Sequence, residues 1–190
     1  MEKNKFINDY ISRLIRILEK VDISPIEAII TLLDKMDNSG NTIYIIGNGG
    51  SAATSSHMAN DFGTGLKRRN LKNLNVVSLA DNTSVVTAIG NDIGFENIFY
   101  MQIKDVIRAE DVLLVISCSG NSPNLIKAVQ YAKTFGTKIV SLTGFDGGKL
   151  MELSDINYHV PTEFGEYGLC EDMHMIFDHI IYSYFTRDEK

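Results

Sequence analysis

The sequence predicts an α/β protein, a three-layer αβα sandwich on a five-stranded parallel sheet that is preceded by an N-terminal helical hairpin. Two observations point to this fold. Five short apolar segments alternate with stretches of helical periodicity, which is typical of a parallel sheet covered by helices on both faces. Two of these segments run into glycine- or serine-rich turns that open a helix, as happens where ligands bind at the carboxyl edge of such sheets.

The composition excludes several classes of function. The chain has 190 residues and a net charge of −6, which argues against a surface that neutralises nucleic-acid phosphates. Its longest strongly apolar runs, such as residues 112–116, are too short to span a bilayer, and the first residues lack a signal-peptide pattern. Two cysteines are too few for a disulfide framework. We therefore expect a cytoplasmic protein that acts on a small molecule, with no nucleic-acid or membrane partner.

The first 40 residues are predicted to form two helices. Residues 4–20 carry apolar side chains at helical spacing. A second helix follows Ser24-Pro25, a good N-cap and first-turn pair, and ends near Gly40. Both helices have broad apolar faces, which must pack on the rest of the chain or on another subunit. We expect residues 1–190 to be one domain, with residues 1–40 used in oligomer packing and residues 41–190 forming the αβα core with its C-terminal helix.

The predicted strands are short apolar segments bounded by turn or helix signals. They are Thr42–Ile46, Asn75–Leu79, Asp111–Ser117, Lys138–Leu142 and Ile156–Val160. The stretches between these strands are predicted to be helical.

The first chemical motif is the turn that follows the strand at 42–46, Gly47-Asn48-Gly49-Gly50-Ser51. Its glycines let the backbone approach a ligand closely, and the helix that follows offers free N–H groups to an anion. The turn superficially matches a dinucleotide fingerprint, but no acidic residue ends a second strand about 20 positions later. A tight turn that binds no ligand is the alternative.

The second motif is Ser117-Cys118-Ser119-Gly120-Asn121-Ser122-Pro123, where the strand at 111–117 gives way to a helix. Hydroxyl groups, a glycine and a helix N-terminus converge here, and no lysine is present, which excludes a Walker A site. The arrangement suits a monophosphate held by hydroxyls and backbone N–H groups. The alternative is that these serines only cap the helix and form the turn.

Together, the two turns resemble those of the sugar isomerase (SIS) domain, and more closely those of the phosphoheptose isomerase family. The resemblance covers essentially the whole chain and extends to Gly90-Asn91-Asp92. It implies that the serine turn binds a sugar phosphate and that the glycine turn and the Asn91-Asp92 pair contact the sugar. The implied substrate-binding residues are Asn48, Gly49, Gly50, Ser51, Asn91, Asp92, Ser117, Cys118, Ser119 and Ser122.

A metal site is also implied. His57 and Asp61 are four residues apart and share a face of the predicted helix, although on their own they are typical of a surface pair. The resemblance implies that they bind zinc together with two residues of the C-terminal helix, Glu171 and His179. These lie eight apart and so roughly on the same side. We therefore expect one divalent metal per subunit, with zinc as the expected ion.

Three positions depart from the family pattern. Asp61 stands where Glu is usual, Glu171 where Gln is usual, and Cys118 where Thr is common. A longer acidic group at 171 is consistent with compensation for a shorter one at 61. These departures leave open which carboxylate is the catalytic base, which sugar is used and which metal binds. Cys170 and His174 are expected to be structural.

The resemblance implies an aldose–ketose isomerase that converts sedoheptulose 7-phosphate to D-glycero-D-manno-heptose 7-phosphate for bacterial surface polysaccharide precursors. The reaction passes through an enediol(ate) and needs a base and an acid, for which we expect Asp61 or Glu171 and His179. The family also implies a homotetramer. Two alternatives stay open: an isomerase or epimerase of another phosphosugar, and a non-catalytic SIS tetramer that binds a replication initiator protein.

Overall fold

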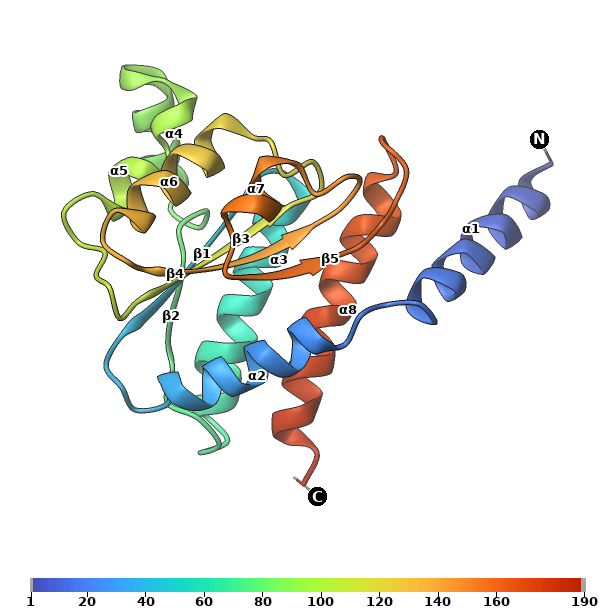
Figure 1. Ribbon diagram of the computed structural model, residues 1–190, viewed down its shortest axis with the longest axis horizontal. Coiled ribbons are helices and arrows are strands. Elements are labelled where there is room, and N and C mark those ends of the chain that lie inside the picture. Colours follow the sequence, from blue (N-terminus) through green and yellow to red (C-terminus); the bar gives the residue numbers. More distant parts are fainter. Residues whose placement is uncertain (1, 189–190) are drawn as a thin grey trace.

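The computed structural model describes residues 2–188 and shows a parallel sheet with helices on both faces (Figure 1). In chain order the elements are α1 (Lys3–Leu18), α2 (Ser24–Met36), β1 (Thr42–Gly47), α3 (Gly50–Met58), the π-helical segment η1 (Ala59–Gly65), β2 (Asn75–Ser78), α4 (Thr83–Ile93), the 3-10 turn η2 (Phe95–Asn97), α5 (Tyr100–Ile103), β3 (Val112–Ser117), α6 (Pro123–Lys133), β4 (Lys138–Thr143), α7 (Gly148–Leu153), β5 (Ile156–His159) and α8 (Tyr167–Thr186).

The sheet has five strands in the order β2-β1-β3-β4-β5, and every neighbouring pair is parallel. This confirms the predicted fold class, and each predicted strand differs from the observed one by a single residue at one end. The central strand β3 is buried along its whole length, as its unbroken apolar sequence predicts. The strand order reverses between β1 and β3, so the turns that follow these two strands meet at the switch point of the sheet.

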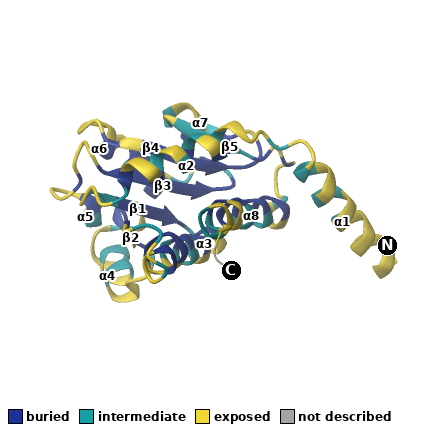
Figure 2. Cartoon of the chain, turned by 90° about the horizontal axis from the view of Figure 1, so that it is seen from below, coloured by how far each residue is buried: buried dark blue, intermediate teal, exposed yellow. Residues whose placement is uncertain are grey.

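Each face of the sheet carries its own core. On one face α2, α3, η1 and α8 pack around Phe62, Tyr158 and Phe177, whose side chains are essentially inaccessible to solvent. On the other face α5 and α6 pack around Phe99 and Leu113. Figure 1 shows the sheet between these two helical layers, and Figure 2 shows that its strands are largely buried. Because both faces are covered, the turns at the carboxyl edge are held rigidly.

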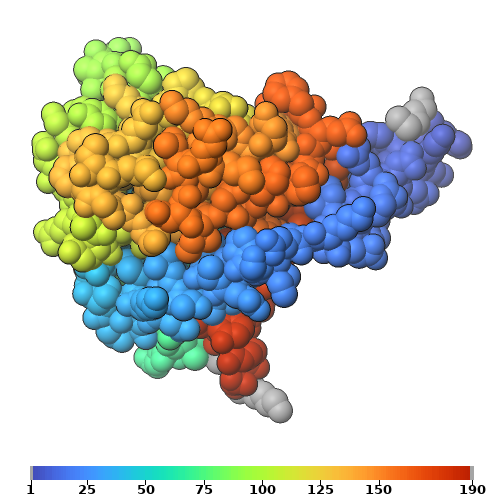
Figure 3. All heavy atoms as spheres, viewed as in Figure 1, coloured from blue at the N-terminus to red at the C-terminus, as the bar shows by residue number. Residues whose placement is uncertain are grey.

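The two N-terminal helices are present, but α1 does not fold back on α2 as a hairpin would. Figures 1 and 3 show α1 reaching away from the body of the molecule. No residue of α1, all of which the structure describes, is buried. Its apolar residues Phe6, Ile7, Ile11 and Ile15 are 50–56% exposed. The reason for the difference is that this apolar stripe has no partner within the described part of a single chain.

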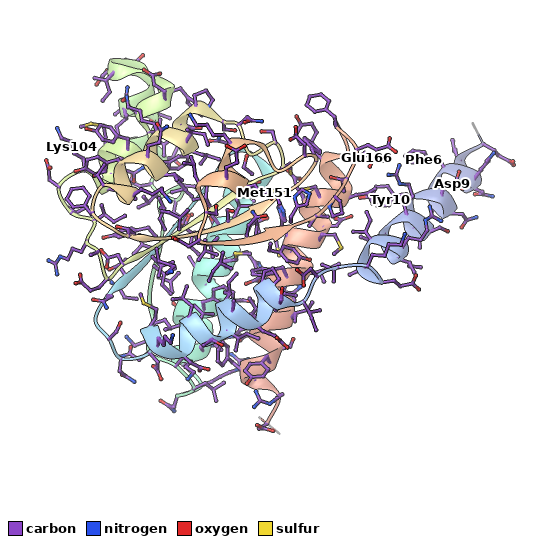
Figure 4. The ribbon with its side chains drawn as sticks, in the orientation of Figure 1. Phe6, Asp9, Tyr10, Lys104, Met151 and Glu166 are labelled. Carbon is purple, nitrogen blue, oxygen red and sulfur yellow. The ribbon has the colours of Figure 1, made fainter. Side chains whose placement is uncertain are left out.

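Polar contacts tie α1 to the start of α8. The Tyr10 hydroxyl donates to the Asp172 carboxylate at 2.6 Å, and Arg13 donates to Glu166 at 2.7 Å. Figure 4 shows Tyr10 and Glu166 near each other across the gap between α1 and the chain leading into α8. The hydrogen bond to Asp172 raises the pKa of Tyr10 to about 12. These contacts fix the direction of α1 without covering its apolar stripe.

Among residues 2–188, no helix is long and apolar enough to cross a membrane.

Candidate active site

A polar cavity of about 310 Å³ lies where β1 and β3 end. The turn between β1 and α3 forms one side, the turn between β3 and α6 forms another, and the first residues of α8 close it. The residues that line it are Asn48, Gly49, Ser51, Ile116, Ser117, Cys118, Ser119, Ser122, Leu125, Tyr167 and Glu171. The structure therefore brings together most of the substrate-binding residues that the sequence suggested.

The glycine turn brings the backbone unusually close to the start of α3. A side chain at Gly47 would place its Cβ 2.6 Å from the backbone oxygen of Ser51, and Gly49 has a φ of +55°. Only glycine adopts that tight path without strain. The N-terminal end of α3, at Ser51, therefore lines the cavity, where the helix dipole favours an anion.

The serine turn is equally constrained. Gly120 has a φ of +62°, and a Cβ there would lie 2.0 Å from the backbone oxygen of Gly147. The Ser117 hydroxyl accepts a hydrogen bond from the Gly120 N–H at 3.1 Å, and the Ser119 hydroxyl accepts one from the Asn121 N–H at 3.3 Å. Ser122 occupies the N-cap position of α6, but its hydroxyl makes no capping hydrogen bond. Both that hydroxyl and the α6 N-terminus are therefore available to a ligand.

A pair of asparagines joins the two turns. Asn48 donates to the Asn124 side-chain oxygen at 3.0 Å, and Asn124 donates back to Asn48 at 2.8 Å. Asn124 is buried, so this double hydrogen bond fixes the separation of the turns. Asn124 was not among the residues predicted to bind the substrate. Its one signal was its position in the first turn of the helix that follows the serines.

Glu171 belongs to this cavity. It lines the cavity from α8, and a Cβ added at Gly50 would lie 2.5 Å from each of its carboxylate oxygens. The carboxylate thus rests against the N-terminal end of α3, where the helix dipole favours a negative charge. Tyr167, one turn earlier on α8, also lines the cavity and was not predicted from the sequence.

A second group of side chains lies between the end of α3, η1 and α8. The His57 Nε2 is 3.1 Å from the His179 Nε2 and 3.5 Å from the Asp61 Oδ2. Asn60 donates to the other oxygen of Asp61 at 2.9 Å, which orients this carboxylate toward His57. Three of the four residues predicted to bind metal are therefore together, and Glu171 is not in this group.

Asp178 occupies the fourth position. One ligand atom from each of His57, Asp61, Asp178 and His179 lies within 4.8 Å of all the others. The Asp178 side chain is fully buried, and neither of its oxygens has a hydrogen-bond partner among the described residues. Burial, together with the charge of Asp61, raises the pKa of Asp178 to about 7. Such a donor set, with an unpartnered buried carboxylate, fits a divalent cation.

Asp178 was missed, although the sequence carried a signal. Residues at the spacing 170, 174, 178 and 181 form a buried stripe of α8. A carboxylate on a stripe that is otherwise apolar or weakly polar is an exception that needs a partner.

Cys118 of the serine turn lies together with Cys170 and His174 of α8. Ligand atoms of Cys118, Cys170 and His174 lie within 4.8 Å of one another, and all three residues are buried. Burial lowers the pKa of His174 to about 4. A hydrogen bond from Cys170 lowers the pKa of the Cys118 thiol and raises that of Cys170. These residue types also suit a soft metal such as zinc.

Asn91 and Asp92 are not part of the cavity in this chain. Both are exposed near the end of α4, and Asn91 donates to the Asp92 carboxylate at 2.8 Å. The structure therefore does not place Asn91 and Asp92 with the residues that line the cavity, and their contact with the sugar stays a prediction.

Comparison with known proteins gives a consistent picture. A family model described as the SIS domain matches residues 6–144. The chain is 36% identical over 182 residues to a phosphoheptose isomerase of Aliarcobacter butzleri, covering 94% of each chain. It is 42% identical over 150 residues to a phosphoheptose isomerase of Helicobacter pylori strain P12, covering 79% of this chain and 76% of the relative.

Solved structures agree with these relatives. The phosphoheptose isomerase GmhA from Neisseria gonorrhoeae superposes with a TM-score of 0.87 at 32% identity, covering 98% of this chain and all of that one. A phosphoheptose isomerase from Francisella tularensis gives the same TM-score at 25% identity, covering 99% of this chain and all of that one. The similarity thus includes α1 and α8 as well as the sheet.

Proposed function

Because the chain belongs to the phosphoheptose isomerase family of SIS-domain proteins, we propose that it converts sedoheptulose 7-phosphate to D-glycero-D-manno-heptose 7-phosphate. The observation that carries this proposal is the layout of α8. Its first turns contribute Glu171 to the cavity between the glycine and serine turns, and two turns later it contributes His179 to the group with His57 and Asp61. A long sugar with a phosphate at one end and its reacting carbons at the other suits a site extended in this way.

The phosphate end is assigned to the serine turn. Ser117, Ser119 and Ser122 line the cavity with hydroxyl groups, and the N-terminus of α6 begins beside them. Hydroxyls, backbone N–H groups and a helix dipole bind a phosphate without lysine. This explains how a chain of net charge −6 can hold an anionic substrate.

The proton transfers are assigned to carboxylate and imidazole groups. Isomerisation requires a base that removes a proton from the carbon beside the carbonyl, and an acid that serves the two oxygens. Asp61 and Glu171 are the two candidate bases, and His179 is the acid while no ion is bound to its Nε2; with an ion bound there, His179 helps to organise the site in place of that proton transfer. The glycine turn, from Asn48 to Ser51, holds the sugar against these groups through its backbone.

One divalent metal per subunit, with zinc as the expected ion, completes the proposal. The group containing His57, Asp61 and His179 offers it nitrogen and oxygen ligands. When bound, the ion supplies positive charge that stabilises negative charge developing on the sugar oxygens.

We further propose a cytoplasmic homotetramer that feeds a bacterial surface polysaccharide pathway. The exposed apolar stripe of α1 supports the oligomer, since contiguous apolar surface of this kind marks protein interfaces. The two cysteines of the chain lie close together and are not joined by a disulfide bond. This suits a reducing compartment such as the cytoplasm.

Turnover of sedoheptulose 7-phosphate by the purified protein tests the proposal. We expect Asp61→Ala, Glu171→Ala and His179→Ala to reduce kcat roughly 10²–10⁴-fold where the residue transfers a proton. The control is Glu110→Gln, which changes an exposed carboxylate just before β3, at the opposite end of that strand from the serine turn, and should keep wild-type turnover. Full activity in all three alanine variants would contradict the assignment.

Substrate profiling separates the alternatives. A panel of pentose, hexose and heptose phosphates distinguishes this activity from that of another phosphosugar isomerase or epimerase. The presence of His57, Asp61 and His179 in one group argues against the non-catalytic tetramer, and turnover of any sugar phosphate in the panel would exclude it.

A further inference from the structure

We infer that Asp178, rather than Glu171, is the second carboxylate ligand of the metal, so that the ion is held by His57, Asp61, Asp178 and His179. This rests on the proposed function, which places a divalent ion in this enzyme. The inference replaces Glu171 by Asp178 in the expected ligand set, and Glu171 then remains free to act on the sugar.

The burial of Asp178 is the first argument. Its side chain is fully buried in the described structure, yet both carboxylate oxygens lack a hydrogen-bond partner. An isolated carboxylate removed from water is strongly disfavoured unless a cation or several donors compensate its charge. The facing group is His57, whose Nε2 lies 3.5 Å from the Asp178 Oδ2. That distance is too long for a good hydrogen bond, and a small cation between the two atoms would satisfy both.

The spacing of the ligand atoms is the second argument. Ligands of a tetrahedral zinc ion bind at about 2.0–2.2 Å and therefore lie roughly 3.4 Å from one another. From His57 Nε2, the distances are 3.1 Å to His179 Nε2, 3.5 Å to Asp61 Oδ2 and 3.5 Å to Asp178 Oδ2. All four ligand atoms lie within 4.8 Å of one another. Small adjustments of side-chain torsions are enough to close this set around one ion.

The position of Glu171 is the third argument. Its carboxylate rests against Gly50 in the cavity lined by the serine turn, and it is not in the group with His57. Moving it to the ion would take it from the N-terminus of α3 and from the substrate cavity. Asp178 already faces the other ligands, because its Oδ2 lies 3.5 Å from the His57 Nε2 and its ligand atom lies within 4.8 Å of those of Asp61 and His179.

The test is zinc affinity, measured on the full-length chain after removal of metal by chelation. Zn²⁺ is titrated in competition with a chromophoric chelator, and Co²⁺ is used as a second probe because its visible absorption reports the ligand number and type. We expect Asp178→Asn to weaken Zn²⁺ binding roughly 100-fold or more and to change the Co²⁺ spectrum, as loss of a direct ligand should. Glu171→Gln, the matched carboxylate-to-amide change on the same helix, should bind Zn²⁺ within about threefold of wild type.

Wild-type affinity in Asp178→Asn, combined with a large loss in Glu171→Gln, would overturn the inference. So would a wild-type chain that binds no stoichiometric Zn²⁺. If Asp178→Asn does not fold, Asp178→Leu replaces it, because its surroundings on α8 include Phe177 and Ile181, and the same loss of affinity is expected. Sugar turnover is assayed separately, so a failure of the proposed isomerase activity would leave the affinity result readable.

Discussion

Gly47 and Gly50 lie three residues apart in the same turn, yet a methyl group would meet different neighbours at each. At Gly47 it would meet backbone atoms of Ser51, whereas at Gly50 it would meet the end of the Glu171 side chain. Backbone cannot move aside without disturbing the start of α3, but a glutamate side chain can change its torsions. A substitution at Gly47 therefore tests the stability of the turn, whereas a substitution at Gly50 tests the placement of Glu171.

We predict that Gly50→Ala lowers turnover roughly 10²-fold, because it displaces a group of the site by about an ångström or more, while the free energy of unfolding changes by less than about 1 kcal/mol. Gly47→Ala should cost about 1–3 kcal/mol of stability through overpacking. Kinetic assays and urea unfolding of both variants check this. A Gly50→Ala protein with wild-type turnover would show that the reaction does not need the Glu171 carboxylate in its position against Gly50.

The buried imidazole of His174 predicts how stability depends on pH. Burial lowers its pKa to about 4 in the folded protein, from an ordinary value of 6.5. Between these values the unfolded chain binds the proton and the folded chain does not, so the free energy of unfolding falls as the pH falls from 6.5 toward 4. We expect this residue to account for a loss of about 2 kcal/mol between pH 7 and pH 5.

Urea unfolding at the two pH values measures the loss, with His174→Gln as the comparison. Glutamine can still donate a hydrogen bond toward the Thr143 carbonyl, which His174 contacts at 3.3 Å, but it does not titrate. The variant should lose correspondingly less stability at pH 5. An identical pH dependence in both proteins would contradict the assignment.

At this scale the sequence predicted the cavity better than the metal group. The turn residues were visible because glycine and serine after an apolar strand report local backbone geometry, which a short segment determines by itself. The roles of Asp178 and Asn124 could not be predicted from the sequence, because they depend on which side chains of other elements face them. For the same reason, sequence could not show that Glu171 points to Gly50 rather than to His57.

Among the elements, the strands were predictable and η1 was not. Strand bounds follow from apolar runs that must be buried on both faces, and each was found to within one residue. The sequence predicted an ordinary helix after the glycine turn, whereas residues 59–65 form a π-helical segment that contains Asp61. Such wide turns are rare and occur often at functional sites. They depend on the packing around them, here against β2 and Tyr182.

The exposed apolar stripe of α1 predicts that this helix packs against another subunit. The stripe is half exposed, whereas Tyr10 near the middle of the helix bonds to Asp172 of α8 and Leu14, Ile17 and Leu18 near its end pack against the core. We predict that the double variant Ile7→Ser, Ile11→Ser dissociates the proposed tetramer, because it removes two of the exposed apolar side chains that another subunit would cover. Light scattering on the purified protein measures the mass.

The matched control for this experiment changes the other side of α1. Lys5→Gln combined with Asp9→Asn alters two exposed polar positions that lie about 120–160° around the helix from Ile11 and should leave the mass unchanged. A wild-type chain that is already monomeric would contradict the proposed packing of α1.

For the whole molecule, the metal is expected to stabilise the fold. Its ligands come from α3, η1 and α8, which are far apart in the sequence and pack on the same face of the sheet. An ion that binds only the folded chain stabilises it by about 2.7 kcal/mol at 100 times its dissociation constant. We therefore predict that chelation lowers Tm by several degrees, measured by calorimetry.

A His57→Ala chain is the control for that measurement, because it lacks a ligand and should show no drop in Tm on chelation. If both proteins respond equally, the stabilising ion lies elsewhere, and the group of Cys118, Cys170 and His174 is then the place to examine.

The reach of α1 away from the body has a consequence for how the protein behaves on dilution. In the proposed oligomer the apolar side of α1 is covered by a neighbouring subunit, which ties the folded state to the law of mass action, so that the melting temperature depends on protein concentration. Each tenfold dilution should lower the observed midpoint. In a cell, the first chains made would be the least stable, and each further copy would protect those already present.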